Sequence, residues 1–389
     1  MKLLKILMIY FIFLLGGCQK EIPDDVILSF LNEINVYEDI MFLDLIENSN
    51  VQIINENYKI FPDKIGTQKF KIKYKYNEKN YTEEFTVDVV DKVNPFVYAG
   101  TTQTIKQNTS PHFCDSIIYG DNYDTDPKCE IIGEFDSTNI GKYDIQMKIT
   151  DQSGNETIRK LIVNVVDKLP QSNPSSKEPL EFSKVIEENQ NDNIKFGIDV
   201  SSWQESIDFN DVKNAGASFV MIRLGFQSKS TGELKLDSYF KENLEKAKAA
   251  GLQVGVYLYI LSSNKGEAKN GALWVINELN GESLELPIAF DWEDFSKFRE
   301  YKLSLYTLNE MADAFIKTAI DHGYQGMLYS SKTYLENFWQ NRYDYPVWLA
   351  HYTSKSNYEG KYLMWQLSNN GKIPGINGPV DINIMYLDN

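Results

Sequence analysis

The sequence predicts a multidomain protein in which two small all-β sandwiches precede one α/β barrel. Two observations predict this order. Up to about residue 168, runs of alternating apolar residues are separated by turn residues, as in antiparallel sheets. From about residue 194 onward, short apolar runs alternate with capped helical segments, as in strand–helix repeats. The 389 residues are enough for two or three domains.

Composition restricts the class of partner. The chain is 42% hydrophobic and 24% charged, which is typical of a globular protein rather than a disordered one. Its formal net charge of -16 would repel a phosphate backbone, so we expect no nucleic acid partner. A neutral glycan would be indifferent to this charge.

The first residues have the pattern of an export signal. Lys2 and Lys5 precede an apolar run over 6–15 that is too short to span a membrane as a mature helix. Small residues then precede Cys18, and this order resembles a bacterial lipobox. We expect residues 1–17 to be a signal peptide and Cys18 to be lipidated at the start of a segment over 18–23. The alternative is a plain secretory signal with an incidental cysteine. Lipidation would hold the protein on the outer face of a bacterial cell membrane.

An internal repeat follows in residues 24–168. Both copies contain an Ile-Gly turn followed by an alternating strand, and both end in a Val-Val-Asp-Lys run, at Lys92 and at Lys168. We therefore expect two β-sandwich domains, over 24–92 and 93–168. They resemble bacterial immunoglobulin-like spacer domains, which usually hold a catalytic domain away from a surface.

The second copy contains the two other cysteines and an acidic cluster. An extracellular location would permit a disulfide between Cys114 and Cys129. Asp121, Asp124 and Asp126 have irregular spacing, so a solvated turn is favoured over a calcium site. The sequence has neither a His-Glu-x-x-His motif nor a phosphate-binding glycine loop, and we expect no metal and no cofactor.

Residues 169–193 are rich in Pro, Ser, Asn, Lys and Glu and are predicted to be a linker, with a short helix possible near its end. The barrel is expected over 194–389, with capped helices between its earlier strands. The predicted strands are 196–200, 219–224, 253–259, 286–292, 326–330, 347–351, 362–367 and 382–387. Because the last loops are too short for full crossover helices, the closing part should be irregular or antiparallel.

The fourth predicted strand ends in two acids one residue apart. Alternation along a strand places Asp291 and Glu293 on the same side, with Trp292 on the other. Two carboxyl groups held close together cannot both ionise easily, so the pKa of one rises. A protonated carboxylic acid beside an ionised one can cleave a glycosidic bond.

Other strand ends carry polar and aromatic residues that should meet at the same mouth, because catalytic groups of such barrels lie at the C-terminal ends of the strands. The candidate catalytic residues are Glu293, Asp291, Asp199 and Asp381. The candidate substrate-binding residues are Tyr257, Tyr259, Arg223, Trp348, Tyr352 and Gln366. We expect Arg223 to be a buried partner of a carboxylate rather than a substrate ligand. The rings of Tyr257, Tyr259 and Trp348 are about equally suited to stacking against a sugar ring and to packing in the core.

Seven motifs together resemble the glycoside hydrolase family 25 lysozymes, which are N-acetylmuramidases. They are Gly197-Ile-Asp-Val-Ser-Ser-Trp-Gln204, Val220-Met-Ile-Arg-Leu-Gly225, Val254-Gly-Val-Tyr-Leu-Tyr259, Phe290-Asp-Trp-Glu293, Val347-Trp-Leu-Ala-His-Tyr352, Met364-Trp-Gln366 and Val380-Asp-Ile-Asn383. The resemblance covers residues 196–389. It implies that Glu293 is the general acid and that Asp291 is ionised, either as the nucleophile or as the stabiliser of an oxazolinium ion. It also implies that Asp199 and Asp381 shape the charge of the site, hold water or steady the N-acetyl group. It also implies that the partner is the glycan strand of peptidoglycan.

Three other interpretations remain. The two acids could form a solvated strand end, which would ignore the placement rule for barrels. A related barrel could cut another N-acetylated glycan such as chitin. The protein could also be an inactive wall-binding lipoprotein, but a decayed site should have lost one of the four acids.

Overall fold

The computed structural model describes residues 22–170, 178–339 and 345–387. Cys18 and the predicted signal peptide lie outside these residues. The chain divides into two compact units, Met1–Lys92 and Val93–Asn389. Each unit is described by itself.

The first unit is built on a long β-hairpin. β7 (Gly66–Tyr76) pairs with β8 (Lys79–Val90) through a two-residue turn, Asn77-Glu78, in which both residues have positive φ, as in type I′ hairpins. β2 (Glu33–Asn35) and β5 (Gln52–Ile53) complete a four-stranded sheet. Two short pairs accompany it: β1 (Leu28–Phe30) with β4 (Ile46–Ser49), and β3 (Ile40–Met41) with β6 (Lys59–Ile60). The 3-10 helix η1 (Phe42–Leu45) packs Phe42 and Leu45 into the core.

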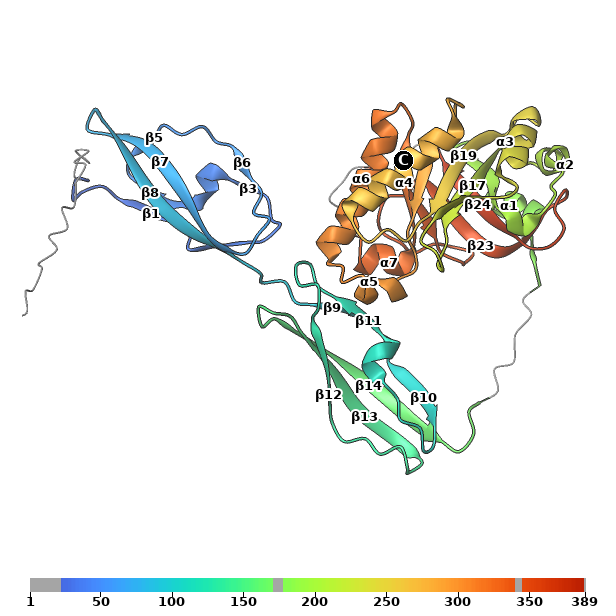
Figure 1. The fold of residues 1–389 in the computed structure, drawn as a ribbon, viewed down its shortest axis with the longest axis horizontal. Coiled ribbons are helices and arrows are strands. Elements are labelled where there is room, and N and C mark those ends of the chain that lie inside the picture. Colours follow the sequence, from blue (N-terminus) through green and yellow to red (C-terminus); the bar gives the residue numbers. More distant parts are fainter. Residues whose placement is uncertain (1–21, 171–177, 340–344, 388–389) are drawn as a thin grey trace, which may run out of the picture. The chain divides into compact units, whose positions relative to one another are not determined.

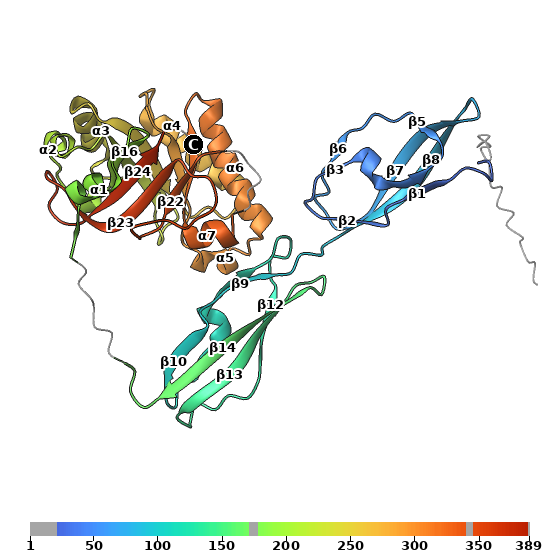
Figure 2. The ribbon, with the colours of Figure 1, turned by 180° about the vertical axis from the view of Figure 1, so that it is seen from behind.

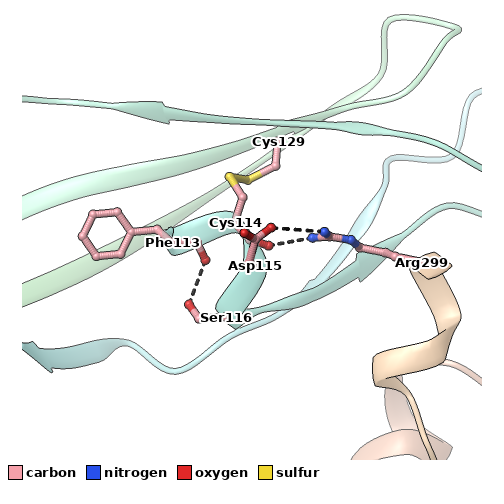
Figure 3. The surroundings of a disulfide bond; sticks show 6 residues. All are labelled: Phe113, Cys114, Asp115, Ser116, Cys129 and Arg299. Carbon is pink, nitrogen blue, oxygen red and sulfur yellow. Dashed lines mark hydrogen bonds and ion pairs between the residues drawn. A yellow bond between two sulfur atoms is a disulfide. The ribbon is translucent and has the colours of Figure 1, made fainter. Parts of the chain in front are cut away.

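The second unit begins with another β region, over 93–168. Its four-stranded sheet has the order β10 (Thr102–Lys106), β14 (Glu156–Val166), β13 (Gly141–Thr150) and β12 (Lys128–Ile132). A short pair, β9 (Phe96–Tyr98) with β11 (Ile118–Gly120), accompanies this sheet. Alternate residues of β13 and β14, such as Ile145, Met147 and Val163, are buried. The 3-10 helix η2 (Phe113–Ser116) is joined to β12 by a disulfide between Cys114 and Cys129 (Figure 3).

The acidic loop of this region orders its own backbone. Asp121 Oδ1 accepts hydrogen bonds from the backbone N–H groups of Tyr123 and Asp124, at 2.9 and 2.8 Å. Asp124 in turn accepts bonds from the backbone and the side chain of Gln152. Asp126 is paired with Lys128 at 2.7 Å. These bonds order a turn, but the loop is not solvated as expected, because Asp121 and Asp124 are buried.

An eight-stranded closed barrel forms the rest of the second unit. Its strands are β16 (Ile194–Val200), β17 (Phe219–Gln227), β19 (Gln253–Tyr259), β20 (Ile288–Asp291), β21 (Gly326–Ser331), β22 (Val347–Ala350), β23 (Met364–Lys372) and β24 (Val380–Tyr386). All neighbours from β16 to β23 are parallel, but β24 is antiparallel to both β16 and β23. Figure 2 shows β22, β23 and β24 together at this closing side. The prediction of an antiparallel closure is confirmed.

Helices connect the earlier strands, as the capping signals predicted. They are α2 (Phe209–Asn214), α3 (Phe240–Ala249), α4 (Lys265–Leu279), α5 (Ser296–Glu300), α6 (Leu305–Asp321) and α7 (Lys332–Asn337). Asp208, Asn264 and Ser304 cap α2, α4 and α6 through their side-chain oxygens. α4 and α6 pack on the same flank of the barrel (Figure 1).

The structure differs from the prediction in two places. Part of the expected linker belongs to the barrel, since β15 (Leu180–Glu181) pairs with β23, and α1 (Phe182–Asn189) buries Phe182 and Val185 in the main core. The short helix expected near the end of the linker is present as α1, but the predicted linker extends too far, because few apolar residues stand among many polar ones in this segment. The short strand β18 (Leu234–Leu236), which forms a hairpin with β17, was not predicted either.

Candidate active site

A cavity of about 350 Å³ opens at the C-terminal ends of the parallel strands. This size lies within the range of about 300–1,000 Å³ that is typical of ligand pockets. Its lining includes all four predicted catalytic acids, Asp199, Asp291, Glu293 and Asp381. Its lining also includes Trp203, Arg223, Tyr257, Tyr329, Trp348, Tyr352 and Gln366.

The end of β20 positions the two acids as strand alternation predicted. Trp292 is fully buried on the opposite side, where its Nε1 donates to the carbonyl oxygen of Ser262 at 3.0 Å and its ring packs on Phe295. This anchor fixes the strand end, so Asp291 and Glu293 both face the cavity. Asp291 is 4% exposed, whereas Glu293 keeps contact with solvent in the cavity.

A hydrogen-bond network holds Asp199 in place. Asp199 Oδ2 accepts bonds from Gln366 Nε2 at 2.9 Å and from Asn383 Nδ2 at 2.7 Å. Trp348 Nε1 donates to Asn383 Oδ1 at 2.8 Å, which orients that amide. Gln366 Oε1 accepts bonds from Tyr329 and from Tyr352. The network therefore fixes Asp199 through residues of four strands of the barrel, β21 to β24.

Burial and mutual repulsion shape the protonation of the site. Burial raises the pKa of Asp199 to about 6, against the opposing effect of its amide donors. Burial, with the charge and hydrogen bond of Asp199, raises the pKa of Asp381 to about 9. The pKa of Glu293 is also raised, first by loss of water in the recess and then by Asp199. The cavity thus favours protonated carboxyl groups, as a general acid requires.

Asp291 differs from the expectation. Burial, followed by the charges of Glu293 and Asp199, raises the pKa of Asp291 well above its ordinary value, which opposes its ionised form. Asp291 Oδ1 is buried and has no hydrogen-bond partner among the described residues. Arg223 lowers this pKa only partly. Its guanidinium is bound to Asp237, with Nη2 2.7 Å from Oδ2.

Arg223 therefore pairs with a carboxylate, as expected, but the partner is Asp237 rather than one of the four acids. Arg223 Nη2 also donates to Ser202 Oγ at 2.9 Å, and Asp237 accepts a bond from the backbone N–H of Ser202. This pair holds the loop that follows β16 next to the end of β17. Because Arg223 also lines the cavity, its positive charge remains close to the four acids.

The predicted sugar platforms have different surroundings. Tyr257 lines the cavity and packs edge-on against Trp348, with ring centroids 5.7 Å apart. Trp348 is only 1% exposed, so its ring offers no free face for stacking, and its role is to hold Asn383. Tyr259 is not among the described residues that line the cavity, and its ring lies next to the ammonium group of Lys229. Tyr352 is 51% exposed at the cavity mouth.

Sequence reasoning missed three residues of the site. Trp203 lines the cavity and is 82% exposed, which makes it the most accessible aromatic face there. It lies in the 3-10 helix η3 (Ser202–Gln204), whose capping box at Ser201 turns the chain at the end of β16. Tyr329 and Asn383 belong to the network around Asp199. Trp203 and Asn383 stand within quoted motifs, so those motifs could have identified them.

The chain forms a closed α/β barrel with a pair of acids at one strand end, in a cavity that further carboxyl groups line. This arrangement is typical of a glycoside hydrolase. Residues 198–376 match the family described as glycosyl hydrolases family 25. The uncharacterized protein YegX of Escherichia coli (strain K12) is 29% identical over 192 residues, which cover 48% of this chain and 68% of that protein. The autolytic lysozyme of Clostridium acetobutylicum is 30% identical over 196 residues, which cover 48% of this chain and 54% of that protein. A solved family 25 glycosyl hydrolase from Bacillus anthracis has 21% identity and a TM-score of 0.44, over 51% of this chain and 91% of that one.

Proposed function

We propose that this protein is a peptidoglycan hydrolase, a 1,4-β-N-acetylmuramidase of the lysozyme type. It cleaves the bond between N-acetylmuramic acid and N-acetylglucosamine. The observation that carries this function is the convergence of Asp291 and Glu293 with Asp199 and Asp381 in one cavity of a family 25 domain. The similarity to an autolytic lysozyme supports the same substrate.

Glu293 is the general acid. Its raised pKa favours the protonated form, and its contact with the open cavity lets it reach the glycosidic oxygen. It donates its proton to the oxygen that leaves with C4 of N-acetylglucosamine. The resulting carboxylate then accepts a proton from the water that completes hydrolysis.

Asp291 stabilises the positive charge that develops on the muramic acid ring. It does so either as a nucleophile or by holding the oxazolinium ion that the substrate's own N-acetyl group forms. A positive charge beside a buried carboxyl group favours the ionised form, so the reacting sugar opposes the effect of burial on the pKa of Asp291. Asp199 and Asp381 set the charge around this ring, and Gln366 and Asn383 hold Asp199.

In this proposal, the N-terminal part of the chain determines where the enzyme is held. Residues 1–17 are a signal peptide, and Cys18 is a lipid anchor on the outer face of a bacterial cell membrane. The β regions over 24–92 and 93–168 are immunoglobulin-like domains that extend the enzyme toward the wall. Among the described residues, no helix is long and apolar enough to cross a membrane.

Digestion of purified cell walls tests the activity. We expect loss of turbidity and, by mass spectrometry, fragments that end in reducing N-acetylmuramic acid. Fragments that end in reducing N-acetylglucosamine would instead indicate a glucosaminidase that cuts the other bond of the same strand. Release of chito-oligomers from chitin alone would indicate a related hydrolase of another N-acetylated glycan. Binding to walls without any fragment would indicate an inactive wall-binding protein. Radiolabelled palmitate incorporation, compared between the full chain and Cys18→Ser, tests the anchor.

A further inference from the structure

A second cavity adjoins the catalytic one. It has a volume of about 680 Å³ and lies between the β region over 93–168 and the barrel, within the second unit. Residues from both sides line it, among them Tyr119, Thr125, Asp126, Glu293, Arg299 and Tyr334. We call this cavity the second groove. Glu293 lines both cavities, so the second groove begins where the catalytic cavity ends.

Polar contacts fix the β-region wall of the second groove to the barrel. Arg299 of α5 donates from Nη1 to the carbonyl oxygen of Cys114 at 2.6 Å and pairs with Asp115 (Figure 3). Its guanidinium also lies 4.6 Å from the centre of the Tyr119 ring. The disulfide of Cys114 with Cys129 ties this wall to the sheet of the β region. Arg299 and Asp115, which both line the groove, are therefore held in place by their contact with each other.

Apolar contacts hold the same wall from behind. The Phe96 ring lies 4.4 Å from the Phe338 ring and 5.8 Å from the Phe298 ring, centre to centre. Gly120 packs so closely on Phe298 that an added Cβ would collide with that ring. Phe298 and Phe338 are each 1% exposed. Such close packing makes the wall part of the site rather than a loosely tethered neighbour.

The position of Glu293 determines which part of a glycan the second groove receives. The ring that is attacked lies beside Asp291 and Asp199, in the catalytic cavity. The proton of Glu293 goes to the oxygen that joins this ring to the leaving sugar. The leaving portion therefore continues from Glu293 away from Asp199, toward the second groove.

The charges along the second groove suit a neutral sugar. Asp126 is paired with Lys128, Asp294 with Lys229, and Asp115 with Arg299. These paired charges offer hydrogen-bonding groups without a strong net field, and the Tyr119 and Tyr334 rings add apolar area. Hydroxyl and acetamido groups of an N-acetylhexosamine match such a surface.

We propose that the second groove binds the leaving-group side of the glycan, beginning with the N-acetylglucosamine. The β region over 93–168 then contributes directly to substrate specificity, in addition to its reach. This inference rests on the muramidase function proposed above.

Filling the second groove tests the inference in the full-length protein. Thr125 is exposed, lines the groove and lies outside the catalytic cavity, so Thr125→Trp narrows the groove without changing the acids. Thr104→Trp is the matched control, because Thr104 is an exposed residue of β10 that does not line the groove. Ser116→Trp fills the groove from a second position. Two substrates are compared: peptide-free glycan strands, and a GlcNAc–MurNAc disaccharide with a 4-methylumbelliferyl leaving group.

We expect Thr125→Trp and Ser116→Trp to lower kcat/KM on glycan strands about tenfold or more relative to Thr104→Trp. Hydrolysis of the methylumbelliferyl substrate should change less than about twofold, because it has no sugar on the leaving side. Unchanged kcat/KM on strands, or an equal loss on both substrates, would overturn the inference. If the unmodified protein releases no fragment with reducing N-acetylmuramic acid from strands, the proposed function itself fails, which is a different result.

Discussion

Asp199 on β16 and Asp381 on β24 are register partners across the antiparallel pair that closes the barrel, and their carboxyl groups share a hydrogen bond. Both groups lie in the catalytic cavity with two further acids. Because the closing strand β24 is antiparallel to its neighbours, it brings Asp381 to the cavity without the crossover connection that a parallel strand would have required.

Replacing Asp381 should change how stability depends on pH. The pKa of Asp381 is raised from 3.8 to about 9 in the folded protein. As pH rises through this window the unfolded chain releases the proton first, so wild-type stability falls. Asn does not titrate, and Asp381→Asn should therefore gain melting temperature relative to wild type, by about 2 °C or more at pH 9 compared with pH 4. Thermal unfolding over this pH range measures the difference. The control is Asp321→Asn, at an exposed helix end. A constant offset of Asp381→Asn across this pH range would contradict the prediction.

Glu293→Gln should lose turnover while keeping fold and glycan binding. The amide cannot donate a proton to the leaving oxygen, and general acid catalysis is typically worth about 10²–10⁴-fold. Wall-clearing rate and glycan binding measure the two effects. Glu245→Gln, on the exposed side of α3, is the matched control. Near wild-type clearing by Glu293→Gln would show that another group is the acid.

The pH profile of the unmodified enzyme provides a separate test of Glu293. Its pKa is raised above the ordinary value of 4.5 by loss of water and by Asp199. The acid must be protonated to act, so kcat/KM should fall as pH rises through this raised pKa. We expect the alkaline limb above pH 4.5, and a limb at or below this value would disprove the environment described for Glu293.

Trp348→Phe should impair catalysis through Asn383. The change keeps an aromatic ring but removes the donor that orients the Asn383 amide toward Asp199. Trp365→Phe removes a comparable bond, from Nε1 to the carbonyl oxygen of His351. Each variant should lose about 0.5–1.5 kcal/mol of stability. Only Trp348→Phe should also lower kcat, by about tenfold, with its pH profile shifted. Equal kcat values in the two variants would show that Trp348 merely packs.

Trp203→Ala should weaken substrate binding. The exposed indole lines the cavity mouth, where its face can pack against a sugar ring. Loss of this contact should raise KM about tenfold while kcat changes little. Steady-state kinetics on glycan strands checks this, and Trp203→Phe should recover most of the loss. A variant with unchanged KM would leave Trp203 outside the binding surface.

The barrel could be predicted because its strands are strongly apolar and its helices begin with capping residues. Alternation alone placed Asp291, Glu293 and Trp292 on their observed sides. Burial of Trp348 could not be predicted, since it depends on the distant partners Tyr329 and Asn383. The raised pKa of Asp291 depends first on its burial and then on the charges of Glu293 and Asp199, and burial in the closed barrel could not be predicted for the same reason.

The first turn of α6 has a consequence for protein production. Its backbone N–H groups at Leu305 and Tyr306 donate to the carbonyl oxygens of Asp121 and Asn122, at 2.8 and 3.3 Å. A recombinant fragment that starts after the β regions would leave these donors without their acceptors and would expose the Phe298 ring to water. Such a shortened enzyme should be poorly soluble. The shortest soluble form of this hydrolase is therefore expected to begin near Val93, far upstream of residues 198–376, which match the family.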